Sequence, residues 1–439
     1  MTAYLCERAW LGPGSISDDV LVEVDGTRIT AVTTDSSSTT ATRLAGLTIP
    51  GFANCHSHAF HRALRGGTQR GRGTFWTWRQ IMYDVAARLD PDAYYGLARA
   101  TYEEMALAGV TAVGEFHYLH HDKLGTPYSD ANEMGLALIR AARDAGLRIT
   151  LLDTCYLSAG FGAAPEGAQV RFSDGDPHSW RERISELSTT VDEIADPHVV
   201  VGSAVHSVRA VSLEAMRVVA NALPDRPLHM HVSEQVAENE ACQDRYGCSP
   251  TRLAAEAGLL SDRFTAVHAT HLTGDDIAVL GAASAYVDFC PTTERDLADG
   301  VGPSRALADA GARLTLGSDS HAVIDMFEEM RAVELDERLT SQQRGHWQSH
   351  ELLTAATATG HRSLGFQNAG RIAPGHWADL VTIDTSTTRT AGTGLGEETL
   401  VFAATAADIT SVVASGVRLE RDHEAVGRSL DAAIATLTG

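Results

Sequence analysis

The chain has 439 residues, of which 44% are hydrophobic and 21% are charged, an ordinary globular composition for one large domain or two smaller ones. Its formal net charge of -22 at pH 7 argues against anionic partners such as nucleic acid and acidic membrane surfaces. The sequence lacks a membrane-length apolar run and a signal-peptide pattern, and its six scattered cysteines read as reduced thiols, so we expect a cytoplasmic protein.

The first 48 residues read as short strands joined by turns. The stretch LVEVDGTRITAV alternates apolar residues around Asp25-Gly26, a dipeptide typical of hairpin turns. This segment is too short to hold a core alone. The C-terminal stretches GRIAPGHWADLVTID and DITSVVASGVRL also read as strands. We therefore predict that residues 1–48 and 365–439 form a composite β-sandwich domain.

Between these segments, apolar β-rich runs alternate with amphipathic, alanine-rich helical patterns. The runs are Leu47–Cys55, Thr111–Phe116, Arg148–Cys155, Val199–Val205, Pro227–His231, Phe264–His268, Ala285–Cys290 and Arg313–Leu316. Eight strands alternating with helices are typical of an α/β (β/α)8 TIM-like barrel, although a doubly wound open sheet fits the alternation too. Polar, reactive-looking residues follow nearly every strand, at the end where barrels build active sites. We therefore predict a catalytic (β/α)8 barrel over residues 49–364.

Two connections are long for a compact domain. Phe60 to Asp90 follows the first barrel strand, and Ser158 to Trp180 follows the third. Connections of this length are usually lids or disordered segments, and we interpret both as lids.

The first barrel strand ends in His56-Ser57-His58. Side chains alternate between the two faces of a strand, so both imidazoles would point to one side at the strand end. Taken alone, such a pair is more often two solvated histidines than half of a metal site. The ends of the other strands decide between these interpretations.

Three later strands also end in residues that can bind a metal or move a proton. They are His229, His231 and Glu234 at the fifth strand, His268 and His271 at the sixth, and Asp319 at the eighth. Any one of these histidines could be a core residue. Together, His56, His58, one histidine of the fifth strand and Asp319 would offer three imidazoles and a carboxylate. Such a set suits Zn²⁺ or Fe²⁺ with a position left for water, so we predict a metal centre.

These motifs resemble the amidohydrolase superfamily, and within it the mononuclear deaminase branch. The features are HxH after the first strand, H-x-x-E at the fifth, His after the sixth and Asp after the eighth, and GRIAPGHWADLVTID resembles the branch's C-terminal sandwich. The resemblance implies His56, His58, His231 and Asp319 as metal ligands, with Glu234, His268 and Asp319 as catalytic groups. It leaves His229 without a metal role and gives His271 a supporting one.

The lysine content supports a single ion. Superfamily members with two metals typically bridge them with a modified lysine from the fourth strand. Here that strand reads VVVGSAVHSVRA, and the one lysine of the chain, Lys123, follows the second strand. We expect one divalent ion per chain, Zn²⁺, with Fe²⁺ as the alternative.

Polar residues at the predicted rim of the barrel bear on the substrate. His206 and Arg209 follow the fourth strand, and arginine pairs bidentately with carboxylates. Five arginines crowd the first long connection, namely Arg62, Arg65, Arg70, Arg72 and Arg79. That cluster fits a solvated loop equally well. A histidine and an arginine at one strand end nevertheless favour a small anionic substrate.

Several stretches resemble the family of N-formimidoyl-L-glutamate deiminases, which act in histidine degradation. They are HSHAFHRAL, FWTWRQIMY, EFHYLHH, HSVRAV, VHATHLT, CPTTERDLADG and GSDSH. The resemblance implies that Arg79, Tyr118, His206 and Arg209 hold the substrate's carboxylates. His61 belongs to the same substrate-binding set, but the family commonly has glutamine there, which leaves its role open.

The same resemblance implies a reaction, the hydrolytic deamination of N-formimidoyl-L-glutamate to N-formyl-L-glutamate and ammonia. Asp319 would accept a proton from water, Glu234 would protonate the imino nitrogen, and His268 would orient the nucleophile.

Two other functions stay open at this stage. The same apparatus could deaminate a nucleobase or another cyclic amidine, on which Trp76 and Trp78 could stack, although an arginine-rich rim suits such a ring poorly. The chain could also be a catalytically silent metal-binding protein, against which the complete ligand set and Glu234 argue. We also expect a homodimer, although no sequence feature indicates the oligomeric state. We expect no nucleic-acid or membrane partner.

Overall fold

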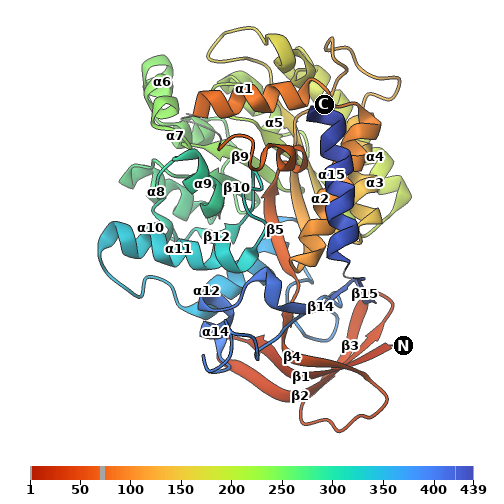
Figure 1. Cartoon of the computed structure of the whole chain (residues 1–439). Coiled ribbons are helices and arrows are strands. Elements are labelled where there is room, and N and C mark those ends of the chain that lie inside the picture. The colour runs from red at the N-terminus through yellow and green to blue at the C-terminus, as the bar shows by residue number, and fades with distance from the viewer. Residues whose placement is uncertain (1, 70–74, 421, 439) are drawn as a thin grey trace.

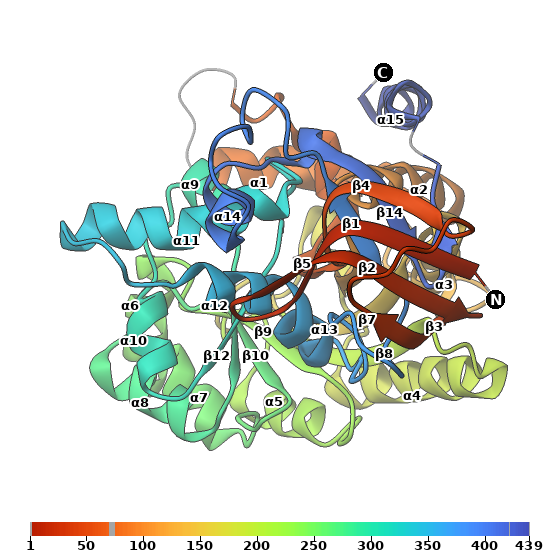
Figure 2. The same cartoon turned by 90° about the horizontal axis from the view of Figure 1, so that it is seen from below.

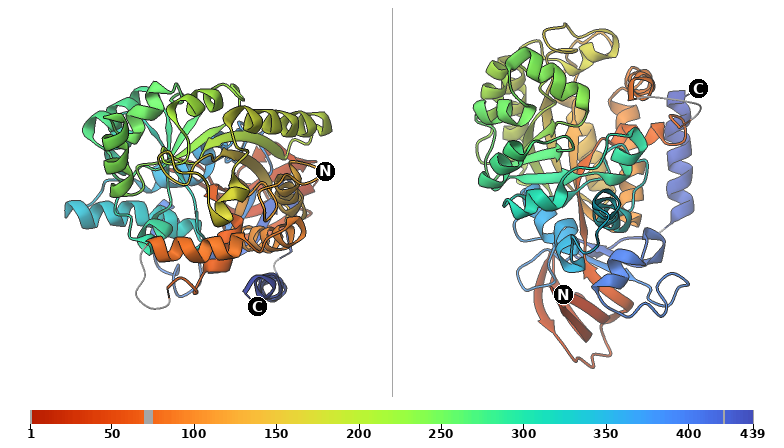
Figure 3. Two further views of the ribbon diagram at one scale, coloured as in Figure 1. Left: turned by 90° about the horizontal axis from the view of Figure 1, so that it is seen from above. Right: turned by 90° about the vertical axis from the view of Figure 1, so that its left-hand side faces the viewer.

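The computed structural model describes residues 2–69, 75–420 and 422–438, and it contains two separate sheets (Figure 1). The larger has eight strands in chain order, each parallel to its neighbours. They are β5 (Phe52–Ser57), β6 (Val110–His117), β7 (Arg148–Cys155), β8 (Val199–Val205), β9 (Leu228–Val232), β10 (Phe264–His268), β11 (Tyr286–Phe289) and β12 (Arg313–Leu316). Helices surround these strands when the molecule is seen from above (Figure 3).

The eight-stranded sheet closes on itself where β5 meets the chain just after β12. The backbone N–H of Asp319 donates to the carbonyl of His56 at 3.0 Å, and the N–H of His58 donates to the carbonyl of Asp319 at 3.2 Å. Ser57 and Asp319 form a parallel bridge between the two ends. The chain therefore forms a barrel, and the open doubly wound sheet is excluded.

The first predicted strand is corrected by the structure. The apolar run Leu47–Cys55 is divided between β4 (Thr42–Pro50), in the second sheet, and β5, in the barrel. The division falls at Gly51, where an added Cβ would lie 2.4 Å from side-chain atoms of Thr111. Only glycine permits this close approach, which lets one continuous segment leave the second sheet and enter the barrel.

The second sheet joins strands from both ends of the chain, in the order β15-β14-β13-β4-β1-β2-β3 (Figure 2). Its remaining strands are β1 (Thr2–Gly12), β2 (Ser15–Asp25), β3 (Arg28–Thr33), β13 (Leu380–Ile383), β14 (Ile409–Ala414) and β15 (Val417–Arg418). The predicted hairpin is present, because Asp25 pairs with Arg28 between β2 and β3. The predicted fold class, a (β/α)8 barrel with a small β-sandwich from the two terminal segments, is confirmed.

The helices occupy the stretches where the sequence is amphipathic. They are α1 (Phe75–Ala86), α2 (Pro91–Leu107), α3 (Glu133–Asp144), α4 (Pro177–Ile194), α5 (Leu213–Ala220), α6 (Val236–Tyr246), α7 (Pro250–Glu256), α8 (Gly274–Ala282), α9 (Pro291–Leu297), α10 (Ser304–Asp309), α11 (Met326–Ser341), α12 (Ser349–Thr354), α13 (Gly360–Ser363), α14 (Glu397–Phe402) and α15 (His423–Thr438). Several begin with an acceptor and a proline; Asp90, for example, accepts the N–H of Ala93 at the start of α2. Of the helices in the described part, none is long and apolar enough to cross a membrane.

The two long connections contain regular structure. The first holds the 3₁₀ turn η1 (Ala59–Leu64) and α1, and the second holds the 3₁₀ turn η2 (Gly167–Phe172). Helix α1 lies across the end of the barrel that is opposite the second sheet (Figure 1). The lid interpretation stays a prediction for both.

The division into a composite domain (1–48 and 365–439) and a barrel (49–364) also stays a prediction. Helix α15 falls within the first of these parts, yet it lies along α2 of the barrel (Figures 1 and 3). Arg88, which precedes α2, donates to the carbonyl of Leu437 in α15 at 2.6 Å.

A buried ion pair connects the barrel to the second sheet. Arg148, at the start of β7, donates from both terminal nitrogens to the carboxylate of Asp379, at 3.1 and 2.6 Å. Both side chains are almost fully buried, and Asp379 directly precedes β13. The Arg148 guanidinium also lies 4.5 Å from the centre of the Trp377 ring.

Arg148→Met should lower the free energy of unfolding by about 3–5 kcal/mol, because it leaves the buried Asp379 carboxylate without a cation. Urea unfolding followed by tryptophan fluorescence measures the change. As a control, Arg217→Met removes a pair with Glu256 whose side chains are 50% and 59% exposed, and should cost about 1 kcal/mol or less. Equal losses in the two variants would show that the buried pair does not hold the sheets together.

Candidate active site

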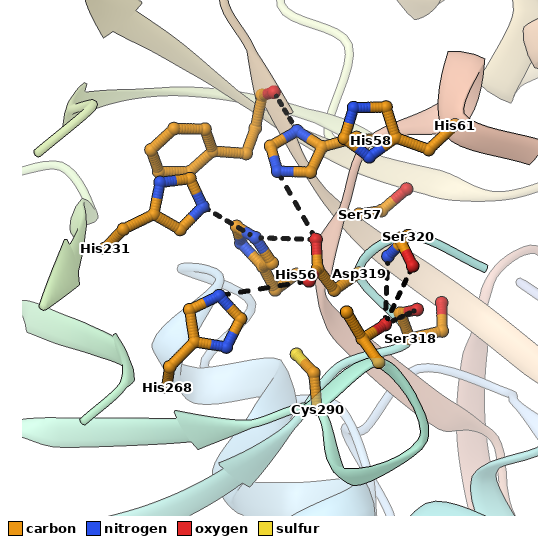
Figure 4. Close-up of polar contacts among 12 residues, drawn as sticks. His56, Ser57, His58, His61, His231, His268, Cys290, Ser318, Asp319 and Ser320 are labelled. Atoms are coloured by element: carbon orange, nitrogen blue, oxygen red, sulfur yellow. Dashed lines mark hydrogen bonds and ion pairs between the residues drawn. The ribbon is translucent and has the colours of Figure 1, made fainter. Parts of the chain in front are cut away.

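The four predicted metal ligands meet at the C-terminal end of the barrel (Figure 4). Oδ1 of Asp319 lies 3.4 Å from Nε2 of His56 and 3.4 Å from Nε2 of His58. Nε2 of His231 lies 3.1 Å from Nε2 of His56. Atoms bound about 2.0–2.1 Å from a tetrahedral zinc ion lie roughly 3.3 Å apart, so this spacing fits one common ion.

Backbone carbonyls fix the orientation of two of these imidazoles. Nδ1 of His58 donates to the carbonyl of Phe116 at 2.9 Å, and Nδ1 of His231 donates to the carbonyl of His206 at 2.9 Å. A carbonyl only accepts, so each ring carries its proton on Nδ1 and presents an Nε2 lone pair to the centre. Burial holds the pKa of both rings well below the usual range, so they are neutral imidazoles, the form that can bind a metal.

The lone pairs that converge here need a cation. The Nε2 lone pairs of His58 and His231 and the carboxylate of Asp319, whose Oδ1 lies 3.4 Å from Nε2 of His58, are all electron-rich and buried, so without a cation they repel one another. A divalent ion satisfies all of them at once, and the donor set of nitrogen and carboxylate oxygen is one that Zn²⁺ and Fe²⁺ accept. The residues present therefore fit a metal ion.

The backbone at the strand ends is bent so that the side chains face this centre. Asp319 has φ 40° and His268 has φ 67°, in the left-handed region that residues with a Cβ seldom adopt and that recurs at functional sites. Gly317 allows the turn after β12, because a Cβ there would lie 2.7 Å from the Cβ of His56.

His268 links Asp319 to a buried glutamate. Its Nε2 lies 3.8 Å from Oδ2 of Asp319, and its Nδ1 lies 3.4 Å from Oε1 of Glu294. Burial lowers the pKa of His268, but the hydrogen bond with Glu294 and the charges of Glu234 and Asp319 more than offset it and raise this pKa to about 10. For Asp319, burial raises the pKa of the carboxyl group. The hydrogen bond with His56 and the nearby imidazoles outweigh this effect and lower the pKa to about 2. Asp319 is therefore an ionised carboxylate.

A cavity lies over the cluster, and it brings together the predicted residues other than His56. Its lining comprises His58, His61, Arg79, Tyr118, His206, Arg209, His231, Glu234, His268 and Asp319, together with Trp78, Met82, Tyr83, Tyr156, Phe172 and Leu297. The carboxylates of Glu234 and Asp319 and the cations of Arg79 and Arg209 face the same enclosed space. The arrangement can therefore hold an anionic ligand beside a metal centre.

The residues around the cations are hydrogen-bonded to one another. Nε of Arg79 donates to the hydroxyl of Tyr83 at 2.5 Å, and Nε of Arg209 donates to Glu238 at 3.4 Å. Nε2 of His61 lies 3.0 Å from the hydroxyl of Tyr118. These contacts hold the polar groups of the rim in place.

Other predicted residues lie outside the cavity. Arg62 and Arg65 both pair with Glu104 of α2, at 2.6 and 2.7 Å, so they fasten the first long connection. His229 is buried and is not a member of the metal-ligand cluster, and His271 donates to the backbone carbonyl of Asp299 at 2.7 Å; the roles expected for both stay predictions. Arg70, Arg72 and the side chain of Trp76 lie outside the part of the chain that the structure describes.

Sequence reasoning found Tyr118 but missed two other tyrosines of the cavity wall, Tyr83 and Tyr156. Tyr156 directly follows the last residue of β7, so the rule used for the other strand ends would have found it. Tyr83 lies one helical turn after Arg79, on the same side of α1. That spacing was the available signal.

A second buried cluster contains His117, His120 and Asp153. Asp153 already accepts from Arg183 at 2.7 Å and from the indole of Trp180 at 2.9 Å. A guanidinium thus supplies the positive charge there, and this cluster needs no metal ion.

The model of the Amidohydrolase family matches residues 47–419. The chain belongs to the amidohydrolase family. A formimidoylglutamate deiminase from Pseudomonas aeruginosa is 36% identical to this amidohydrolase over 397 residues, which cover 88% of this chain and 86% of that protein. A 5-methylthioadenosine/S-adenosylhomocysteine deaminase from Halobacterium salinarum is 29% identical over 417 residues, covering 93% and 90% of the two chains. The predicted superfamily is confirmed.

Solved structures share the fold over the full length. An amidohydrolase from Brucella melitensis superposes with a TM-score of 0.92 at 31% identity and covers 100% of both chains. An adenosine deaminase from Xanthomonas campestris, solved with bound zinc, superposes with a TM-score of 0.85 at 23% identity and covers 99% of this chain and 98% of that one. Together with the His/Asp cluster, family membership shows that this amidohydrolase is a metal-binding hydrolase.

Proposed function

We propose that this amidohydrolase converts N-formimidoyl-L-glutamate and water into N-formyl-L-glutamate and ammonia, the activity for which its Pseudomonas aeruginosa relative is named. The observation that carries the proposal is one cavity with a metal-ligand cluster and two arginines on its wall. The substrate has matching parts: a formimidoyl group that water can attack, and two carboxylates that guanidinium groups can hold.

The metal site would hold one divalent ion, Zn²⁺, through His56, His58, His231 and Asp319. When bound there, a divalent ion polarises water so that it can act as a nucleophile near neutral pH. Zn²⁺ is preferred because imidazole nitrogen and carboxylate oxygen are its usual ligands, and its coordination number can increase to admit water beside four protein groups.

The protein's own groups would then move the protons. Asp319 accepts a proton from water as the water oxygen attacks the formimidoyl carbon, and Glu234 on the cavity wall protonates the imino nitrogen. The C–N bond to that nitrogen then breaks: the proton held by Asp319 leaves with ammonia, and the hydroxyl proton of the adduct returns to Glu234 as the formyl C=O forms. His268, anchored by Glu294, orients the attacking oxygen and stabilises the negative charge that develops on it.

The cationic wall would hold the glutamate part of the substrate. Arg79 and Arg209 supply two guanidinium groups, and Tyr118 and His206 line the cavity between strand ends. His61 reaches this group through its hydrogen bond with Tyr118, so we propose that it positions the tyrosine hydroxyl.

The function is tested by incubating metal-loaded protein with N-formimidoyl-L-glutamate, adenosine, guanine and cytosine. Ammonia release and N-formyl-L-glutamate, identified by mass spectrometry, are expected with the first compound. Preference for a ring compound would favour the cyclic-amidine alternative, and absence of ammonia from all four would favour a silent metal-binding protein. The homodimer and the cytoplasmic location stay predictions.

Purified protein should contain about one divalent ion per chain, because four ligands from three strand ends form one set. Elemental analysis by mass spectrometry measures the ratio. A chelator should remove the ion and lower the melting temperature, since an ion that binds only the folded chain stabilises it. Two tightly held ions per chain would contradict the mononuclear interpretation.

Glu234→Gln should keep the metal and lose activity on the order of 10²-fold or more in kcat, because an amide cannot transfer a proton. Steady-state kinetics on protein of known metal content measure the loss. Glu240→Gln, on helix α6, is a matched control outside the cavity and should retain wild-type kcat. Near-normal kcat in metal-replete Glu234→Gln would remove Glu234 from the mechanism.

Arg209→Met should lower kcat/KM on N-formimidoyl-L-glutamate by about 10- to 100-fold, because a charge-assisted hydrogen bond to carboxylate is worth roughly 1.5–3 kcal/mol. The rate on an N-alkylformamidine without carboxylates, already poor, should change little. Arg217→Met, on the helix that follows the same strand, is the control and should change neither rate. Equal losses on both substrates would mean that Arg209 is structural.

A further inference from the structure

Gln169 is a buried glutamine that connects the two long segments over the barrel. It lies in η2, is 6% exposed, and is absent from the cavity wall. Its Nε2 donates to the hydroxyl oxygen of Tyr83 in α1 at 3.0 Å and to that of Tyr156 after β7 at 2.7 Å. Both tyrosines line the cavity.

The side-chain amide of Gln169 has a fixed orientation. Its Oε1 accepts the backbone N–H of Glu166 at 3.2 Å, as part of a capping box at the start of η2. The amide oxygen is thus held toward the backbone, and the NH₂ group is held toward the tyrosines. An NH₂ group has two hydrogens, one for each tyrosine oxygen.

The network has a consequence for Tyr83 and Arg79. The oxygen of Tyr83 accepts from Gln169 and from Nε of Arg79, so both of its lone pairs are occupied. Burial and the neighbouring Tyr156 raise the pKa of Tyr83 to about 12, so this phenol keeps its proton at neutral pH. Tyr83 can therefore act only as a donor toward its other neighbours, while its oxygen holds the guanidinium of Arg79.

We propose that Gln169 is a positioning residue that sets the preference for carboxylate ligands. Because Tyr83 and Tyr156 accept from Gln169, their hydroxyl hydrogens are directed onward, to each other and, together with Arg79, to an anion in the cavity. This inference rests on the proposed function and names a residue that touches no substrate. A ligand with acceptor atoms only, such as a carboxylate, fits a wall on which hydroxyls and a guanidinium all donate. Without Gln169, the tyrosine oxygens turn to accept from other donors, and the bond between η2 and α1 is lost.

Two variants separate this role from a merely structural one. Gln169→Leu removes both N–H donors at similar volume. Gln169→Glu keeps an oxygen for the N–H of Glu166 but replaces the NH₂ group by an acceptor, which the tyrosine hydroxyls would turn toward. Gln80→Leu is the matched control, because Gln80 is an exposed glutamine of α1 whose amide contacts Asp84.

Binding of glutarate, a dicarboxylate probe, is measured by calorimetry on the metal-loaded full chain, alongside kcat, KM and metal content. Gln169→Leu should raise the Kd for glutarate and the KM for N-formimidoyl-L-glutamate about 10-fold, the size expected for loss of one or two hydrogen bonds, and change kcat less than about 3-fold. Gln169→Glu should weaken binding further, and Gln80→Leu should match the wild type.

The proposal is overturned if either Gln169 variant binds glutarate like the wild type, if kcat falls while the Kd is unchanged, or if the wild type does not bind glutarate. The glutarate measurement does not use activity. A wild-type protein that binds glutarate in a Gln169-dependent manner but releases no ammonia would refute the proposed reaction and leave the role of Gln169 supported.

Discussion

The hydrogen bonds that close the barrel also bring together the predicted metal ligands. Asp319 donates its backbone N–H to His56, and His58 donates to Asp319, so the first and last barrel strands are joined at the residues whose side chains face the centre. The ligand spacing therefore depends on barrel closure and on the carbonyls that orient His58 and His231. Ligands held in this way need little reorganisation when a cation binds, which is the physical meaning of a preorganised site.

The same closure explains why so much of the site was predictable from the sequence. Strand alternation places His56 and His58 on one face, and the (β/α)8 pattern puts the ends of all parallel strands at one end of the barrel. The break at Gly51 was not predictable, because Leu47–Cys55 is one apolar run and both strands that it supplies are buried. The bonds that Arg62 and Arg65 make to Glu104 depend on how α2 packs, which no local pattern reveals.

At the rim of the cavity, sequence motifs identified the cationic residues but not the contacts that those residues make. Arg79 and Arg209 were found as isolated cations, but their environments differ. Arg209 faces Glu238, so part of its charge is compensated within the protein, whereas Nε of Arg79 is held by the neutral hydroxyl of Tyr83. The Arg79–Tyr83 contact is local, within one helical turn, whereas the contact of Arg209 with Glu238 joins residues 29 apart in the sequence. Gln169, which contacts Tyr83 and Tyr156, has no distinguishing feature in its own stretch of chain.

The strand order of the second sheet determines when its strands can pair during synthesis on the ribosome. Strand β4 is translated early, but one of its two partners is β13, whose first residue is Leu380. Until that point, β4 presents an unpaired apolar edge directly upstream of the metal-binding strand, and such edges invite pairing with other chains. The edge of β4 is therefore covered only after Leu380–Ile383 have been translated, so the fold of the second sheet is completed late in synthesis.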